Sequence, residues 1–267
     1  MGLAAAWIDA FTDRPYGGNP AAVVRLERPI PDRAMQDLAR EFGLSETAFL
    51  LPEGDGWRLR WFTPAIEVRL CGHATVASAW FLTEAGLADR EAPIAFWSRS
   101  GRLGARRAGD WIELDFPARP VTPTDPPPGL ADAIGAWPLG SYAVDEDLLV
   151  EVASEAELDR LTPDFAAISA LPIRGVIVTA QGSGTADFAS RFFVPRVGIP
   201  EDPVTGSAHC ALAPFWAARL GRTELTGVQR SARGGTVRVR VEGDRVHLGG
   251  QAVTIWRGEL AVDPGAA

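Results

Sequence analysis

The arrangement of apolar and polar positions occurs twice along the chain, in residues 60–86 and again in residues 191–221. Each segment starts with an apolar stretch typical of a strand, passes through a polar loop to a glycine, and ends in an alanine-rich apolar run. The run predicts a buried helix, and Gly86 or Gly221 follows it as a C-cap glycine does. With three extra residues in the second copy, the matched pairs are Arg60 and Arg191, Phe62 and Phe193, Pro64 and Pro195, Gly72 and Gly206, Ala74 and Ala208, Ala77 and Ala211, Ala79 and Ala213, and Phe81 and Phe215.

A predicted hairpin follows each copy. Residues 99–116 and 230–250 both contain alternating apolar and polar positions on either side of a Gly-Asp pair. The alternative is a chance likeness between two alanine-rich helices, but four features in the same order favour duplication of one α+β unit. Two copies of this length do not form a solenoid of short repeats.

The stretch between the copies, residues 117–129, reads PARPVTPTDPPPG. Such a density of proline fits neither a central strand nor the interior of a helix. We therefore predict an N-terminal domain at residues 1–117, a linker at 118–129 and a C-terminal domain at 130–267, and we leave open that the last strand returns to the first domain. A site at the interface of the two domains is the natural expectation.

Composition narrows the possible partners. The 267 residues are 46% hydrophobic and carry 26 basic and 34 acidic side chains, a net charge of −8, which argues against nucleic acid and anionic membrane as partners. No apolar run has the length of a membrane span, and the first residues lack the basic start of a signal peptide. With only Cys71 and Cys210, the chain has no disulfide framework, so we expect reduced thiols and a cytoplasmic protein.

The predicted helices begin just after Gly72 and Gly206, and helix N-termini carry free N–H groups and partial positive charge. If the two starts face one another, they form a single pocket for an anion such as a carboxylate. Asp202 and Ser207 surround the second start, inside the motif EDPVTGSAH. Both are good capping residues, and capping is compatible with ligand binding. Asp202 is expected to fall in the three-residue insertion of the second copy.

Candidate proton carriers stand near the first helix start. His73 begins that helix, where it serves either as a cap or as a catalyst. Ser45 and Glu46 precede an apolar run that predicts a buried strand, and partial burial raises the pKa of a glutamate towards that of a general base. The alternative for Glu46 is an ordinary exposed loop residue. Asn19 follows two glycines at a turn into a strand and offers its amide to a ligand.

Other kinds of chemistry lack a sequence signature. Neither a dinucleotide fingerprint nor a Walker motif occurs, and there is no G-x-S-x-G nucleophile elbow. The three histidines do not pair at ligand spacing, and Cys210 beside His209 is not a zinc signature. We therefore expect neither a cofactor nor a metal.

Five motifs in order resemble the PhzF-like phenazine-biosynthesis family, which has the diaminopimelate epimerase fold; they are IDAFTDRPYGGNPAAVV, LSETAFL, RWFTPAIEVRLCGHAT, DFPARP and EDPVTGSAH. The resemblance implies two similar domains, each a barrel-like, mostly antiparallel sheet around a central helix, with the site in the cleft between them. It also implies cofactor-free acid/base chemistry in a homodimer. The family's catalytic Glu, His, Asp and Ser fall on Glu46, His73, Asp202 and Ser207.

Cys71 departs from this pattern. The related epimerases use two thiols on opposite faces of the substrate, and Cys71 stands at the first thiol position, whereas the repeat places Thr205 at the second. We expect a cofactor-independent isomerase that shifts a proton on a small carboxylate, with Glu46 as base and then acid. The alternatives are a racemase or epimerase that uses Cys71, and a non-catalytic binding or interaction protein. The expected substrate contacts are Asn19, Ser45, Cys71, Gly72, Ala74, Thr205 and Gly206.

Overall fold

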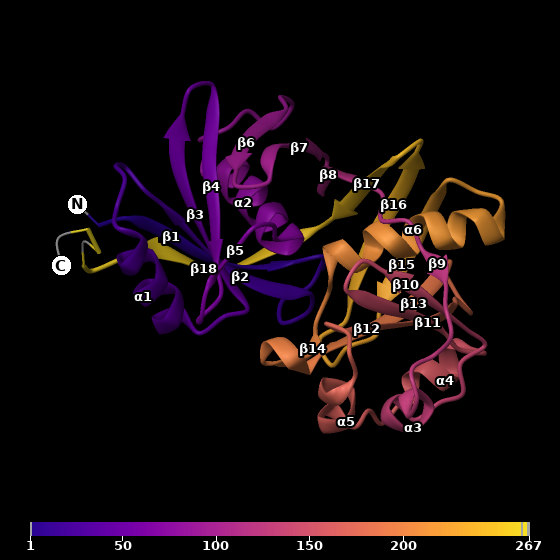
Figure 1. Cartoon of the computed structure of the whole chain (residues 1–267). Coiled ribbons are helices and arrows are strands. Elements are labelled where there is room, and N and C mark those ends of the chain that lie inside the picture. The colour runs from indigo at the N-terminus through magenta and orange to yellow at the C-terminus, as the bar shows by residue number, and fades with distance from the viewer. Residues whose placement is uncertain (1, 263, 266–267) are drawn as a thin grey trace. The chain divides into compact units, whose positions relative to one another are not determined.

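The computed structural model describes residues 2–262 and 264–265 (Figure 1). They form two compact units. The first contains the described residues up to Asp115 and those from Gly249 onward, and the second is Phe116–Leu248.

The first unit contains most of its strands in the N-terminal half of the chain. Its elements are β1 (Ala4–Ala10), β2 (Asn19–Arg25), α1 (Asp32–Phe42), β3 (Glu46–Glu53), β4 (Gly56–Phe62), β5 (Glu67–Val68), α2 (Gly72–Glu84), β6 (Ile94–Ser98), β7 (Gly101–Ala108), β8 (Trp111–Pro117) and β18 (Ala252–Glu259).

The second unit adds three short helices before its strands. Its elements are β9 (Thr122–Pro123), α3 (Leu130–Ile134), β10 (Gly140–Val144), β11 (Asp147–Glu151), α4 (Glu155–Asp159), α5 (Phe165–Ala170), β12 (Val176–Gln181), β13 (Phe188–Val194), the 3₁₀ turn η1 (Pro195–Val197), β14 (Ile199–Asp202), α6 (Gly206–Leu220), β15 (Glu224–Gln229), β16 (Gly235–Glu242) and β17 (Arg245–Gly250).

The two units share one order of strand pairing. In the first, β2 pairs antiparallel with β1 and parallel with β3, β3 pairs antiparallel with β4, and β4 pairs antiparallel with β5 and parallel with β6. In the second, β11 pairs antiparallel with β10 and parallel with β12, β12 pairs antiparallel with β13, and β13 pairs antiparallel with β14 and parallel with β15. Each series continues into an antiparallel partner, β7 or β16. The predicted duplication is therefore confirmed.

The copies also share an ion pair that fixes a short strand to a long one. Arg60 donates two hydrogen bonds of 2.7 Å to the Glu67 carboxylate, and Arg191 donates two of 2.8 and 2.9 Å to the Glu201 carboxylate. Such bidentate pairs are more geometrically specific than single contacts, because both partners are planar. Each guanidinium also lies over a phenylalanine two residues further along its strand, 5.1 Å from the ring centroid in the first unit and 4.9 Å in the second.

This pairing corrects the alignment around Asp202. Trp61 lies opposite Val68, and its equivalent Phe192 lies opposite Asp202. Asp202 therefore occupies the position of Val68. The prediction that Asp202 falls in the three-residue insertion is wrong. The extra residues are absorbed before β14, at the irregularity after Phe193 and in η1. A carboxylate thus replaces an apolar side chain at an otherwise repeated position.

Helices α2 and α6 are buried on nearly all sides, as the alanine-rich pattern predicted. Small side chains let the surrounding strands approach the helix closely, and a helix that is apolar all round belongs in a core. α1 behaves differently, since it turns Met35 and Ala39 inward and leaves most of its polar residues exposed. Met35 and Ala39 pack with Val24 and Phe49 in a cluster of the first unit.

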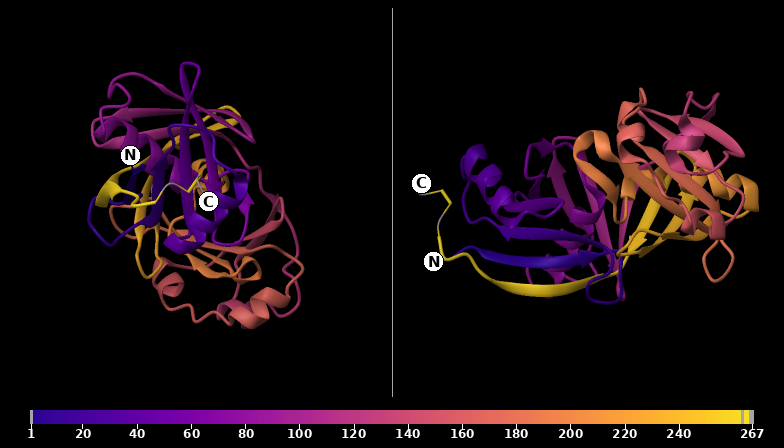
Figure 2. Two further views of the ribbon diagram at one scale, coloured as in Figure 1. Left: turned by 90° about the vertical axis from the view of Figure 1, so that its left-hand side faces the viewer. Right: turned by 90° about the horizontal axis from the view of Figure 1, so that it is seen from below.

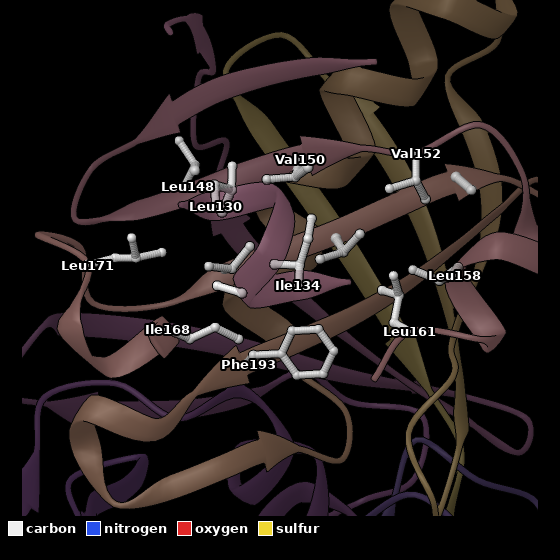
Figure 3. Close-up of a cluster of buried hydrophobic side chains, with 14 of the residues drawn as sticks. Leu130, Ile134, Leu148, Val150, Val152, Leu158, Leu161, Ile168, Leu171 and Phe193 are labelled. Carbon is white, nitrogen blue, oxygen red and sulfur yellow. The ribbon is translucent and has the colours of Figure 1, made fainter. Parts of the chain in front are cut away.

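A second cluster fills the space between the strands and short helices of the second unit (Figure 3). Leu130 and Ile134 of α3 belong to the same buried cluster as Val150 of β11 and Phe193 of β13. Ile168 of α5 is also part of this cluster. The Phe165 ring lies edge-on to Phe193, with centroids 6.2 Å apart. These contacts hold α3 and α5 against the sheet, although neither helix is long enough to be stable alone.

The last strand follows the second repeat in sequence but pairs with a strand of the first unit. β18 follows the second hairpin but pairs antiparallel with β1, so the chain returns to the first unit; Figure 2 shows the yellow strand beside the indigo one. β9, which follows the first hairpin, pairs in the same sense with β10 of the second unit. The proline-rich stretch therefore includes two residues of paired strand.

His209 is the most buried polar side chain of α6, with no exposed surface. Its Nδ1 lies 2.8 Å from the carbonyl oxygen of Thr205 and therefore carries the proton, since a carbonyl only accepts. Nε2 is buried without a hydrogen-bond partner among the described residues. Burial lowers the pKa of His209 to about 4, against the opposing effect of the bond to Thr205. The imidazole is therefore neutral at neutral pH.

This buried imidazole should make stability depend on pH. Its folded pKa of about 4 lies below the ordinary histidine value of 6.5, so the unfolded chain binds the proton more strongly, and stability falls as pH decreases through this window. We expect His209 to remove about 2 kcal/mol of unfolding free energy between pH 7 and pH 5. His209→Asn keeps a donor near Nδ1 but does not titrate. Urea titrations at several pH values should therefore give the variant a flatter pH dependence, and equal slopes would contradict the assignment.

Candidate active site

Glu46 opens strand β3 and lies beside Ala21 of the parallel strand β2. Its side chain keeps only 14% of its surface exposed, so Glu46 is not an exposed loop residue. Ser45 stands in the bend just before the strand and is half-buried. The apolar residues that follow fix β3 in the core and leave the carboxylate at its edge.

His73 and Cys71 come from the start of α2. Cys71 is the N-cap residue, in extended conformation, and His73 is the second residue of the helix. The thiol Sγ lies 3.5 Å from His73 Nδ1, and His73 Nε2 lies 3.2 Å from Glu46 Oε2. The imidazole therefore stands between a thiol and a carboxylate. The second contact is close in distance but is not aligned as a hydrogen bond.

The imidazole of this group is neutral. Burial lowers the pKa of His73 to about 3, and a backbone hydrogen bond to Pro20 acts in the opposite direction. A neutral imidazole has one nitrogen that donates and one that accepts. It can therefore receive a proton at one nitrogen while it gives one from the other, which is what a proton relay requires.

The turn before β2 packs tightly against β1. Gly18 has a φ of 61°, and a Cβ there would lie 2.1 Å from the carbonyl oxygen of Ala10, so only glycine fits. Asn19 is fully buried and lies opposite Ala10. Asp9 is also buried, and it accepts a hydrogen bond of 2.8 Å from the backbone N–H of Tyr16. The glycines therefore have a structural reason, and Asn19 belongs to the same tight region.

The start of α6 carries a different polar group. Thr205 is the N-cap residue and donates its hydroxyl proton to Asp202 in a short hydrogen bond. Gln229 of β15 ties both ends of this turn, because its Oε1 accepts from Thr205 N at 2.8 Å and its Nε2 donates to the Asp202 carbonyl at 2.7 Å. Asp202 and Thr205 are thereby held together, as their places in one motif suggested.

Ser207 lies in the first turn of α6 and is half-buried, between Gly206 and Ala208, which are both buried. Arg119 donates from Nη1 to the Ser207 carbonyl at 3.2 Å and bonds through its side chain to Asp147 at 3.2 Å. Its backbone N–H also bonds to the carbonyl of Cys210, at 3.0 Å. Arg119 thus fixes the first turns of the helix.

Sequence reasoning missed two residues that shape this region, Gln229 and Arg119. Gln229 is 1% exposed, and a buried amide at the end of the apolar strand ELTGVQ was the available signal. Arg119 lies in the DFPARP motif, which contributed to the family resemblance but did not suggest a role for Arg119. Both act on the α6 start, and neither belongs to the repeated pattern.

Both central helices begin without a side-chain cap. Neither Cys71 nor Thr205 accepts a hydrogen bond from the first turn of its helix. The N-cap side chains of these two helices are therefore not their caps. Uncapped first-turn N–H groups, together with the helix dipole, favour a bound anion. In unit one the nearby side chains are Cys71, His73 and Glu46; in unit two they are Thr205, Asp202 and Ser207.

No helix in the described part of the chain is long and apolar enough to cross a membrane.

Comparison with known proteins assigns the family. The profile of the family described as "Phenazine biosynthesis-like protein" matches residues 8–258. An "Uncharacterized isomerase" of Halalkalibacterium halodurans is 48% identical over 255 residues, which are 95% of this chain and 96% of that protein. A solved PhzF-family protein of Enterococcus faecalis has a TM-score of 0.94 at 41% identity and covers 98% of this chain and 100% of its own.

A more distant structure relates the fold to that of the racemases. A probable proline racemase of Agrobacterium radiobacter has a TM-score of 0.64 at 13% identity, covers 98% of this chain and 94% of its own, and shares the fold alone. The expected α+β fold, with its two similar barrel-like units around central helices, is thereby confirmed. The repeated pairing, the buried helices and the matches over nearly the whole length agree, and the chain belongs to the phenazine biosynthesis-like, or PhzF-like, family of isomerases with the diaminopimelate epimerase fold.

Proposed function

We propose that this isomerase moves a proton on a small carboxylate substrate without a cofactor, with Glu46 as the proton carrier. The observation that carries the proposal is the contact between Glu46 and the neutral His73 at the uncapped start of α2. A half-buried carboxylate beside an imidazole suits general acid/base catalysis, because a positioned carboxylate can accept a proton from a substrate and return it. The family membership supports the same class of reaction.

The proposed reaction balances within the substrate. Glu46 takes a proton from a C–H bond, and the electron pair of that bond forms a new double bond. The electrons of the neighbouring double bond then bind the proton that Glu46 returns to the far carbon. Neither an oxidant nor a leaving group is needed, and Glu46 ends as the carboxylate that it was at the start.

The remaining polar groups orient the substrate in this proposal. The backbone N–H groups at Gly72 and Gly206 bind its carboxylate, because uncapped helix starts favour negative charge. Asp202 and Ser207 bind its other polar groups, and His73 assists the proton transfer. The proposal assigns both helix starts to one substrate, with Asn19, Ser45, Ala74 and Thr205 as further contacts. A homodimer and a cytoplasmic location stay predictions.

The racemase alternative rests on Cys71. Cys71 Sγ lies 3.5 Å from His73 Nδ1, a distance that suits a thiol beside an imidazole partner. Inversion at carbon, however, needs a second base on the opposite face. The residue equivalent to Cys71 in the second copy is Thr205, and its hydroxyl is committed to Asp202. We therefore rank the alternative second.

We expect Glu46→Gln to reduce turnover by roughly 10²–10⁴ with little change in ligand affinity, because the amide keeps the shape but cannot carry the proton. The substrate can be found by screening metabolites in heavy water by NMR for enzyme-dependent C–H exchange. Glu53→Gln is the matched control, since Glu53 ends the same strand and pairs with Arg58 at the surface. Near-normal turnover in Glu46→Gln would remove Glu46 from the mechanism.

Cys71→Ser should retain activity within about tenfold, equivalent to less than ~1.4 kcal/mol in the barrier, because a single carboxylate can remove and return the proton on one face. The measurement is steady-state turnover on the same substrate, beside Glu46→Gln. A loss as large as that in Glu46→Gln would place the racemase mechanism first.

Small carboxylates or sulfate should bind next to Gly72 and Gly206 in crystals, at helix starts whose N-cap side chains make no capping hydrogen bond. Crystal structures with several such anions would test this. Anions found consistently elsewhere would separate the helix starts from substrate binding.

A further inference from the structure

The start of α2 gathers three side chains with metal-ligating atoms. One ligand atom each from Glu46, Cys71 and His73 can be chosen so that all three lie within 4.8 Å of one another. A thiol, an imidazole and a carboxylate are the three kinds of ligand that zinc takes in proteins. Calcium and magnesium prefer oxygen ligands alone, so the donor set points to a softer cation.

Single distances within this group match one edge of a tetrahedral zinc site. In a tetrahedral site, Zn–S and Zn–N bonds of about 2.3 and about 2.0 Å place sulfur and nitrogen roughly 3.5 Å apart. Cys71 Sγ and His73 Nδ1 are 3.5 Å apart, and His73 Nε2 and Glu46 Oε2 are 3.2 Å apart. A single ion binds only one of these two nitrogens, so only one of the two contacts can be an edge of the site. The remaining ligand atom would have to reach the ion by side-chain rotation, starting from a group whose chosen atoms lie within 4.8 Å of one another.

The backbone that carries these ligands is fixed by secondary structure. Glu46 belongs to β3, and Cys71 and His73 belong to the start of a buried helix. Cys71 is 7% and His73 is 5% exposed, so little water surrounds the donors. Rigid, largely dehydrated donors lose little conformational entropy when they bind an ion.

The charges also balance. A thiolate and a carboxylate neutralise a divalent cation, and zinc binds cysteine as the thiolate. Three protein ligands leave the fourth position of a tetrahedral ion open for water or another ligand. An anion there would also lie close to the uncapped first turn of α2, which attracts negative charge.

We propose that Glu46, Cys71 and His73 form a zinc-binding site that inhibits the enzyme. The ion would occupy the carboxylate and imidazole that carry the proton, so that catalysis and zinc binding exclude each other. This inhibition rests on the proposed function, whereas the binding does not. Sequence reasoning compared the spacings of histidines and the Cys210–His209 pair, and did not compare Cys71 with His73 or with the distant Glu46.

Cobalt(II) is the probe, because it replaces zinc in thiolate sites and absorbs light. The reduced full-length protein, freed of metal, should bind one equivalent of Co²⁺ with a near-ultraviolet thiolate charge-transfer band and strong visible bands of a tetrahedral ion. Excess Zn²⁺ should abolish both. Cys71→Ser should lose the charge-transfer band, and Glu46→Gln should bind Co²⁺ at least tenfold more weakly.

Cys210→Ala is the matched control. It removes the other thiol, which is buried in α6 and has a pKa raised to about 12 by burial, and it should keep the full cobalt spectrum. Circular dichroism of each variant verifies that it is folded. Absence of the charge-transfer band in the folded parent, its persistence in Cys71→Ser, or its loss in Cys210→Ala would each overturn the site.

The inhibition has a separate readout. Zn²⁺ should stop substrate C–H exchange in the parent and in Cys210→Ala, and a chelator should restore it. Cobalt binding without inhibition would leave the site standing and overturn its link to proton transfer. Full activity in Glu46→Gln, together with the expected cobalt spectrum in the parent and weakened Co²⁺ binding in Glu46→Gln, would remove the proposed function alone.

Discussion

Burial of one helix inside each sheet is the constraint on which the rest of the structure depends. A helix surrounded by strands must be narrow, so α2 and α6 are rich in alanine, and their apolar surfaces provide much of each core. Such a helix satisfies its own N–H and C=O groups except at its ends. The first turn is therefore the place where a buried helix still offers polar groups, and both helices leave that turn without a side-chain cap.

The same constraint explains which parts could be predicted from sequence. Alanine spacing, a glycine before each helix and alternating hairpins are local patterns, and they gave the duplication, the helices and the candidate residues of EDPVTGSAH. The register of a short strand is not local. Asp202 pairs opposite Phe192, at the place of Val68, because Arg191 and Glu201 set β14 against β13 beyond an irregular turn. Counting inserted residues cannot find that turn.

Contacts between segments that are far apart in the chain were the other feature that the sequence could not predict. The sequence presented Glu46 and His73 as separate candidates, and only the packing of β3 against α2 brings Nε2 within 3.2 Å of Oε2. Gln229 escaped notice for a similar reason, since its role depends on a turn that lies far away in sequence. The sequence likewise did not connect Cys71 to His73, although they are neighbours, because an extended residue followed by a helical turn is needed to bring Sγ towards Nδ1.

The two helix starts have equivalent backbones but carry side chains of different chemistry. At equivalent N-cap positions, one copy carries a thiol beside an imidazole and the other a hydroxyl bonded to a carboxylate. Thr75 and His209, four residues after each N-cap, both bond to its carbonyl, so the backbone of the two starts is fixed alike. The backbone can thus present the same N–H groups in both copies while the side chains diverge. A thiol, an imidazole and a half-buried carboxylate can exchange protons, whereas a hydroxyl held by a carboxylate is suited to fixed hydrogen bonds. The two copies therefore carry side chains of different chemistry on equivalent helix starts.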